Sequence, residues 1–331
     1  MQAILDYLEF TVPAEQTGDV LTGLPGGLTL LERGWRGYTH SALCAGDKGR
    51  VGWSPERPDM GCHVSLGSQG LGILGALDER WAHRGEIVRW VQDELGGHVT
   101  RLDVAWDDFD GALDMGVIRD ALRNGDFVSR WRSSKEWGWL FGGQGQTIYM
   151  GSPKSDAYLV IYDKAAERAA KGEHFDGEHW IRVELRLRRE RADKAAALFK
   201  NAGGDLLGAM SYLAGVLRGY IEFKEPADRG DSNKQRRRPA SWWLSFLGGV
   251  EKARLSVDEA EAQTVQDVMA WVSSQVAPSL ALLQEALGFD RAWGFLWAEA
   301  QDGRHRWKAR HRAILAASGA GGPVMQAVTG G

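Results

Sequence analysis

Three segments of the sequence place charged or phenolic side chains at alternate positions. If residues 100–108 (TRLDVAWDD) form a strand, Arg101, Asp103 and Asp107 share one face, because successive side chains of a strand point to opposite sides. Carboxylates on one face suit a hard divalent cation such as Mg²⁺ or Mn²⁺, which prefers oxygen ligands. The alternative is that Asp107 and Asp108 only begin a turn. This segment predicts a metal site built on Asp103, with Asp107 as its weaker member.

The second segment, residues 180–187 (WIRVELRL), alternates in the same way. Arg182, Glu184 and Arg186 would lie opposite a row of apolar side chains. A solvated strand face would produce this pattern as well. Beside a strand that carries Asp103, however, Glu184 becomes a candidate oxygen ligand, and the arginines become candidate contacts for phosphate groups.

The third segment, residues 156–164 (DAYLVIYDK), places Tyr158, Tyr162 and Lys164 on one face of a strand. A tyrosine near a lysine and a metal ion is a workable nucleophile, because both cations stabilise a phenolate and the charge on a phosphoryl group. Most tyrosines in strands serve packing instead. The chemistry of this segment therefore depends on the other two segments lying nearby.

The elements that must position these segments alternate between strand and helix. Helices are expected at residues 78–95 and 115–123, where apolar side chains recur at helical spacing. Strands are expected at residues 4–12, 63–66, 99–106, 146–150, 158–163 and 180–187. This order predicts an α+β fold with a largely antiparallel sheet and flanking helices.

A break in composition divides the chain. Residues 225–240 are polar and basic with flanking prolines, which is typical of an exposed linker. We therefore expect a catalytic domain at 1–224, a basic linker at 225–240, a helical region at 241–317 and a disordered tail at 318–331. The helical region has a capping-box pattern at Ser256 and Glu259.

The basic linker carries four cations just before two tryptophans. A pairing of cations with aromatic rings suits a nucleic-acid backbone and its bases. The alternative is a solvated linker that runs into two core tryptophans. The residues are Lys234, Arg236, Arg237, Arg238, Trp242 and Trp243. Trp131, Trp137 and Trp139 form a second candidate for base stacking, although such residues more often belong to a core.

Composition and missing motifs exclude several classes of protein. The net charge of −4 argues against a protein that coats nucleic acid by bulk electrostatics and favours a local basic patch. There is no phosphate-binding Gly-x-x-x-x-Gly-Lys-Ser/Thr loop and no His-x-His pair, which makes an ATP-driven helicase or a histidine metal site a poor fit. Cys44 and Cys62 are too few for a disulfide framework or structural zinc. Without a membrane-length apolar run or a signal peptide, we expect a cytoplasmic protein.

Taken in order, these motifs resemble the replication initiation factor family (Rep_trans), which includes plasmid and phage initiators and nickases of integrative elements. The matching landmarks are residues 5–12 (LDYLEFTV), 61–67 (GCHVSLG), 100–103 with Asp107 and Asp108, 148–152 (IYMGS) with Ser155, 161–164 (IYDK) with Glu167, and 182–184 (RVE). Val160 departs from the pattern, because the family often has an arginine there. That departure puts one phosphate contact in doubt.

The resemblance implies a fold like that of the HUH endonucleases, with the histidine pair replaced, and a metal-assisted transesterification. A tyrosine would attack origin DNA at a single-stranded or hairpin nick site, leaving a 5′-phosphotyrosyl link and a free 3′-OH. The implied roles are Tyr162 as nucleophile with Tyr158 and Tyr149 as alternatives, Lys164 as a stabiliser of phosphoryl charge, Asp103, Glu184 and Asp107 as ligands of Mg²⁺ or Mn²⁺, and Arg101, Arg182 and Arg186 as holders of backbone phosphates.

The implied partners are the origin DNA and a host helicase and polymerase, with a homodimer as one assembly left open and no membrane partner. Two other functions remain open from the sequence. One is a non-catalytic DNA-binding regulator with the same fold, and the other is a metal-dependent nuclease that uses water in place of tyrosine.

Overall fold

The computed structural model describes residues 2–131, 138–142, 145–202, 206–226, 233–255, 265, 268–269, 272–305, 307 and 315. The chain divides into two compact units, Met1–Ser256 and Val257–Gly331. The predicted capping box at Ser256 and Glu259 and the predicted tail at 318–331 lie outside the described residues. Within the described part, no helix is long and apolar enough to cross a membrane.

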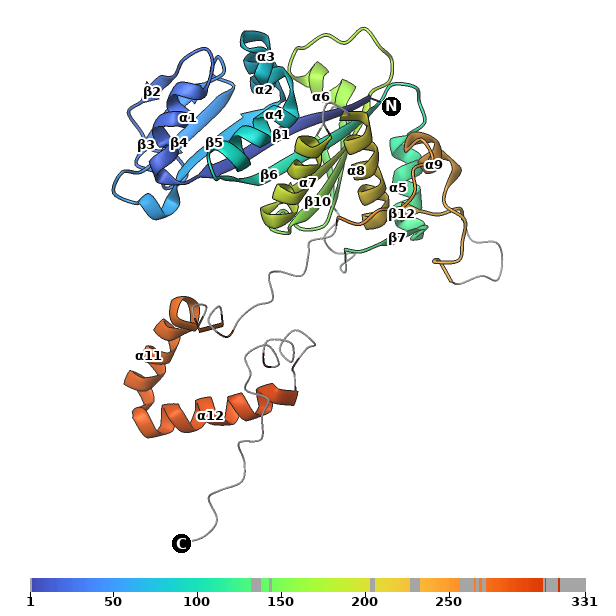
Figure 1. Ribbon diagram of the computed structural model, residues 1–331. Coiled ribbons are helices and arrows are strands. Elements are labelled where there is room, and N and C mark those ends of the chain that lie inside the picture. Colours follow the sequence, from blue (N-terminus) through green and yellow to red (C-terminus); the bar gives the residue numbers. More distant parts are fainter. Residues whose placement is uncertain are drawn as a thin grey trace. The chain divides into compact units, whose positions relative to one another are not determined.

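A ten-stranded sheet forms the centre of the first unit, and its paired strands are antiparallel (Figure 1). In sheet order the strands are β2 (Thr29–Leu31), β3 (His40–Cys44), β4 (Gly49–Trp53), β5 (Cys62–Gly67), β1 (Gln2–Val12), β6 (His98–Asp108), β11 (Ile181–Arg188), β10 (Ala157–Asp163), β9 (Gly145–Met150) and β8 (Gly138–Gly142). The predicted α+β fold with a largely antiparallel sheet is confirmed.

Helices cover the apolar face of this sheet. Leu102, Val104 and Trp106 of β6 are fully buried, and helix α7 packs on that strand. Three buried alanines of α7 allow the helix to approach the sheet closely. The helices of the unit are α1 (Thr17–Gly23), α2 (Ser68–Leu77), α3 (Glu79–Ala82), α4 (Arg84–Arg89), α5 (Met115–Asn124), α6 (Lys164–Ala170), α7 (Arg189–Asn201), α8 (Leu206–Tyr220) and α9 (Ser241–Phe246), with short turns η1 (Ala14–Gln16), η2 (Pro58–Met60) and η3 (Trp90–Glu94).

Two elements differ from the sequence expectation. The helix expected at 78–95 is divided into α3, α4 and η3, because His83 is extended (φ −91°, ψ 101°) and interrupts the helical backbone. Lys164 does not continue the third polar strand. The Asp163 side chain accepts a hydrogen bond from the Ala166 backbone N–H at 2.8 Å, so that Asp163 caps α6 and Lys164 is the first residue of that helix.

The first unit extends beyond the predicted boundary at residue 224. A two-stranded sheet pairs β7 (Phe127–Ser129) with β12 (Ile221–Phe223), and Lys224 pairs with Pro239. Helix α9 follows. Its Trp243 is buried against Phe223, and Phe246 is buried against Trp243. Apolar side chains between residues 241 and 255 therefore belong to the core of the first unit.

The C-terminal unit is helical in its described part. It contains η4 (Val272–Val276), α11 (Ala277–Leu287) and α12 (Phe289–His305). Phe289 and Trp293 stack with ring centroids 6.3 Å apart and are 65% and 60% exposed.

Candidate active site

The strand register gathers the predicted site residues in rows on the polar face of the sheet. The rows, each read from β10 through β11 to β6, are Tyr162, Arg182 and Asp107; Val160, Glu184 and Ala105; and Tyr158, Arg186 and Asp103. Directly paired residues point to the same side of a sheet. The face expected from the period-two pattern is therefore assembled from three adjacent strands.

Arg182 lies in the interior of this face and is only 5% exposed. Its Nε and Nη2 atoms donate to the two carboxylate oxygens of Asp107 at 2.7 and 2.8 Å, and its Nη1 donates to Asp6 at 2.6 Å. Trp180 Nε1 also donates to Asp107, at 2.7 Å. Both oxygens of Asp107 are thus occupied, and Arg182 positions two carboxylates instead of facing a phosphate as the sequence suggested.

Asp103 and Glu184 are paired with the other two arginines. Arg101 donates from Nε to Asp103 at 2.9 Å, and Arg186 donates from Nε to Glu184 at 2.7 Å. Arg186 Nε also lies 3.7 Å from Asp103. The side chains of Arg101 and Arg186 are 18% and 27% exposed, so these arginines reach the surface of the face while Asp103 stays buried.

Asp6 belongs to this group although the strand pattern did not point to it. The pairing of β1 with β6 shifts between Leu5 and Tyr7, and this β-bulge turns the Asp6 side chain toward Arg182. Burial raises the pKa of Asp6 while Arg182 opposes the rise and Glu184 adds to it. A bulge breaks the period-two rule, which is why alternation along β1 would assign Asp6 to the wrong face.

The three carboxylates Asp6, Asp103 and Glu184 come from three adjacent strands. Burial raises the pKa of Asp103 to about 7, against the effect of Arg101 and with a further contribution from Glu184. The Glu184 carboxylate thus raises the pKa of Asp6 and of Asp103. Oxygen donors that repel one another fit a divalent cation, although no group of three metal-binding side chains is preformed among the described residues. Binding a cation there would require the arginines to turn aside.

Tyr162 lies at the edge of this carboxylate group and is partly exposed. Burial, and next the Glu184 carboxylate, raise the pKa of the Tyr162 phenol above its ordinary value. Lys164 Nζ is 5.5 Å from the centre of the Tyr162 ring and forms an ion pair with Glu167 at 2.5 Å. The phenol is therefore protonated at neutral pH, with one cation beside its ring and carboxylates nearby.

The two alternative tyrosines have different surroundings. Tyr158 and Tyr149 stack with ring centroids 5.8 Å apart, and Tyr158 is only 6% exposed. Arg186 lies over the Tyr158 ring at 5.8 Å. Packing accounts for Tyr158 more fully than for Tyr162, which favours Tyr162 as the reactive residue.

His63, which lies in the landmark at 61–67 but was given no role there, extends the same face toward β5. His63 Nδ1 lies 2.9 Å from Thr11 Oγ1, and Arg36 donates to Glu9 at 2.7 Å beside it. Burial lowers the pKa of His63 and Glu9 opposes that shift. A lone histidine in a strand has no sequence signature, because its neighbours come from β1 and from a distant loop.

The basic side chains of the segment at 233–240 differ in their exposure to solvent. Lys234, Arg236 and Arg238 are exposed. Arg237 instead points inward, where it donates to Asp126 at 2.7 Å with side-chain exposures of 8% and 11%. Three of the four predicted DNA contacts thus remain accessible, and Arg237 anchors the segment to the first unit.

Three of the tryptophans predicted to stack on bases pack within the first unit instead. Trp243 is fully buried, and Trp242 packs partly buried on Phe223 at 4.9 Å. Trp131 stacks on Tyr220 at 5.3 Å and donates to the Ala157 carbonyl at 3.0 Å. Trp137 and the side chain of Trp139 lie outside the described residues.

Comparisons with known proteins bear on the family and the fold of this chain. The family model described as replication initiation factor matches residues 97–293. A Bacillus subtilis (strain 168) protein whose name assigns it as a DNA relaxase, NicK, is 30% identical over 205 residues, which cover 58% of this chain and 54% of that protein. The chain thus spans about half the length of this curated relative.

A solved structure has a similar fold. The rolling circle replication initiator protein from Geobacillus stearothermophilus matches with a TM-score of 0.65 and 26% identity, over 77% of this chain and 98% of that chain. The family match covers more than half of the sequence and includes strands β6, β10 and β11, which carry most of the polar face. The chain belongs to the replication initiation factor family.

Proposed function

We propose that this protein nicks and rejoins origin DNA to initiate rolling-circle replication, with Tyr162 as the nucleophile. The observation that carries the proposal is the position of Tyr162, partly exposed beside Lys164 and next to the carboxylates of β1, β6 and β11. Family membership and the likeness to a rolling circle replication initiator support the same reaction. A tyrosine that opens onto charged groups is suited to phosphoryl transfer.

The reaction would proceed by in-line transesterification. The Tyr162 oxygen attacks the phosphorus of a phosphodiester, the bond from phosphorus to the 3′ oxygen breaks, and the phenolic proton leaves to solvent or a neighbouring base. The products are a 5′-phosphotyrosyl link and a strand that ends in 3′-OH. Lys164 and the outer arginines Arg101 and Arg186 stabilise charge on the phosphoryl oxygens. Attack by the freed 3′-OH on the phosphotyrosine reverses the reaction and closes the strand.

Asp103 and Glu184, with Asp6 in the place first assigned to Asp107, would hold the divalent cation. Mg²⁺ or Mn²⁺ would supply charge neutralisation at the phosphoryl group. Asp107 accepts three hydrogen bonds, one from Trp180 and two from the buried Arg182. Asp103 and Glu184 each accept hydrogen bonds from one arginine that reaches the surface and can turn aside. The exposed cations Lys234, Arg236 and Arg238 would hold DNA outside the reacting centre, and a host helicase and polymerase would act on the nicked product.

The test is covalent capture. Wild-type protein, supercoiled plasmid carrying the replicon's own origin and Mg²⁺ or Mn²⁺ should give open circles with protein attached, visible on a denaturing gel. Tyr162→Phe should abolish the adduct, whereas Tyr158→Phe and Tyr149→Phe should retain it. Normal nicking by Tyr162→Phe would show that the nucleophile is another residue. Mass spectrometry of the DNA-linked peptide identifies that residue directly.

A second candidate function is a DNA-binding regulator that does not cut. The pairing of Asp103, Asp107 and Glu184 with arginines favours it, since these carboxylates are already neutralised without a metal. Specific DNA binding with no adduct in any metal would support the regulator. Free 5′-phosphates without adduct would instead indicate a nuclease that uses water.

A further inference from the structure

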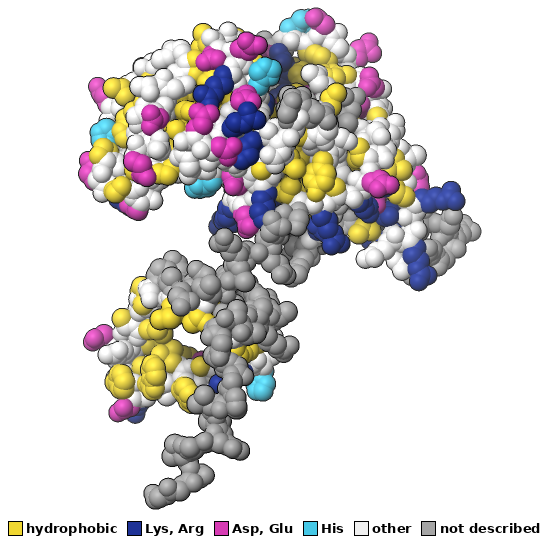
Figure 2. All heavy atoms as spheres, in the orientation of Figure 1, with side chains coloured by type: hydrophobic (Ala, Val, Ile, Leu, Met, Phe, Trp, Pro, Cys, Tyr) yellow, Lys and Arg dark blue, Asp and Glu magenta, His cyan; other side chains and the backbone are white. Residues whose placement is uncertain are grey.

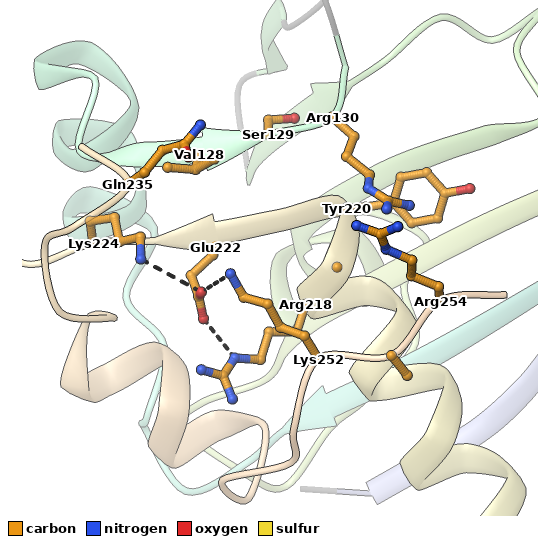
Figure 3. Close-up of a pocket in the computed structure, with 12 residues that line it drawn as sticks. Val128, Ser129, Arg130, Arg218, Tyr220, Glu222, Lys224, Gln235, Lys252 and Arg254 are labelled. Atoms are coloured by element: carbon orange, nitrogen blue, oxygen red, sulfur yellow. Dashed lines mark hydrogen bonds and ion pairs between the residues drawn. The ribbon is translucent and has the colours of Figure 1, made fainter. Parts of the chain in front are cut away.

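A cavity of about 490 Å³ lies outside the catalytic strands (Figure 3). It is bounded by β7, the last turn of α8, β12 and the segments at 233–240 and 250–254. None of its described lining residues comes from β1, β6, β10 or β11. Its volume is in the range of sites that hold small ligands or part of a larger one.

Cations dominate the lining of this cavity. The charged lining residues are Arg130, Arg218, Lys224, Lys252, Arg254 and Glu222. Arg218 Nε donates to Glu222 at 2.6 Å, Lys252 forms an ion pair with the same carboxylate, and Lys224 Nζ lies 3.6 Å from it. One carboxylate therefore faces five cations among the described lining residues, and an excess of positive charge remains.

The neighbouring charges affect the pKa of Lys224, which is buried in this cavity. Burial lowers the pKa of Lys224, Glu222 opposes the shift, and Lys252 lowers the pKa further. Like charges thus repel one another inside the cavity. An anion that enters would relieve this repulsion.

Arg130 and Arg254 are the two cations best placed to meet a ligand. Both are exposed, and Figure 3 draws both among the side chains that line the cavity. Arg130 Cζ is 5.9 Å from the centre of that ring. Tyr220 itself is 7% exposed and is fixed by its stacking on Trp131. Arg130 beside a rigid aromatic ring and Arg254 on the same cavity present fork-shaped donors that match phosphate oxygens.

The positive surface continues outside the cavity. Gln235 lines the cavity, and the exposed cations Lys234, Arg236 and Arg238 lie on the same segment. Figure 2 shows dark-blue Lys and Arg side chains along the part of the first unit where β7 and β12 lie in Figure 1. A line of cations that extends beyond a cavity fits a polymer of phosphates better than a single small anion.

We infer that this cavity is a second phosphate-binding site, which holds backbone phosphates of a DNA segment away from the scissile bond. The proposal rests on the proposed function only for the identity of the polymer as DNA. Its energy comes from release of counterions and is independent of base sequence. The site would keep the origin DNA on the protein while the reacting DNA strand is cut and rejoined at the polar face of the ten-stranded sheet.

The test is the salt dependence of DNA binding by Arg130→Gln/Arg254→Gln. Anisotropy of a fluorescein-labelled single strand of about 30 nucleotides, titrated with full-length protein between about 50 and 300 mM KCl, gives the slope of log K against log salt. Loss of two phosphate contacts should make the slope shallower by about 1.4 and weaken binding by about 10-fold near 100 mM KCl. Arg33→Gln/Lys48→Gln removes two exposed cations elsewhere in the first unit and should leave the slope unchanged.

An unchanged slope in the Arg130/Arg254 variant would overturn the proposal. A second contrary result would be tight binding of ATP or inorganic pyrophosphate that requires these two arginines, combined with DNA binding that does not require them. The cavity would then be a nucleotide site. The covalent adduct reports the catalytic proposal separately. Tyr162→Phe should lose the adduct and keep the wild-type salt slope, so either proposal can fail while the other stands.

Discussion

On the polar face of the sheet, each of the three arginines donates to a buried carboxylate. In the cationic cavity, by contrast, five cations line a space that holds one described carboxylate, Glu222, and three of them contact it. The polar face is built from paired charges on adjacent strands, where short distances hold each side chain in one position. The cavity is built in another part of the same unit from a two-stranded sheet, a helix end and loops, and its described charges are unbalanced. Balanced pairs position reacting groups, while unbalanced charge attracts a ligand.

The largest expected effect comes from breaking a pair on the polar face. Arg182→Met leaves Asp6 and Asp107 buried without their shared cation and should lower the free energy of unfolding by about 3–5 kcal/mol. Urea denaturation followed by tryptophan fluorescence measures the change. The matched control is Arg254→Gln in the cavity, an exposed side chain whose loss should change stability by less than about 0.5 kcal/mol. Equal losses for both variants would remove the distinction between the two regions.

The basic segment offers the same contrast between neighbouring residues. Arg237→Gln leaves the buried Asp126 carboxylate without its ion pair and should cost about 2 kcal/mol of stability. Arg236→Gln, next to it but exposed, should leave stability unchanged and weaken DNA binding about 3-fold near 100 mM salt. Thermal unfolding and anisotropy on the two variants check these opposite outcomes. A stable Arg237→Gln protein would argue against an anchoring role.

Removing the carboxylate of the cavity should strengthen DNA binding, whereas removing a cation weakens it. Glu222→Gln increases the cation excess and should tighten binding of a labelled single strand by about 3-fold at low salt, with a steeper salt slope. Anisotropy measures binding by this variant. The control is Glu86→Gln, which removes a partly exposed, ion-paired glutamate of α4 outside the cavity and should leave DNA binding unchanged. Weaker binding by Glu222→Gln would mean that Glu222 contributes order to the cavity rather than limiting its charge.

The smallest expected effect is a difference in acid stability. Burial raises the pKa of Glu222, but hydrogen bonds from Lys252 and Arg218 outweigh it and hold the pKa below the ordinary 4.5. A carboxyl with a depressed folded pKa contributes stability that is fully present above the unfolded pKa and is lost as pH falls through the folded pKa. The wild-type protein should therefore lose stability below about pH 4.5 more steeply than Glu222→Gln. Urea denaturation at a series of pH values from 6 to 3 measures the free energy of unfolding of both proteins. An equal loss of stability in the wild type and in Glu222→Gln would contradict the lowered pKa of Glu222.

Much of the polar face was predictable, because strands β6, β10 and β11 obey the period-two rule without interruption. That rule placed Asp103, Glu184 and Tyr162 on one side of a sheet before any pairing was known. It failed at Lys164, where Asp163 caps a helix, and at Asp6, where a bulge turns the side chain over. Both failures arise from local backbone geometry that hydrophobic alternation does not encode.

The partners of the charged residues were not predictable. Arg101, Arg182 and Arg186 looked like phosphate contacts, yet each donates to a carboxylate of its own or a neighbouring strand. Sequence shows which side chains share a face but not which pairs meet within hydrogen-bond distance. The cationic cavity was missed for the same reason, since its residues come from positions 128–130, 218–224, 235 and 252–254.

The sequence by itself determined the antiparallel α+β sheet, the polar rows on its three central strands and the resemblance to replication initiators, because alternation along a strand is a local property. Only the tertiary structure decided that Asp6 accepts a hydrogen bond from Arg182, that Arg237 and Trp243 belong to the interior, and that five cations line one cavity. These outcomes depend on strand register, a bulge and contacts between distant segments, and such contacts form only when the whole chain packs.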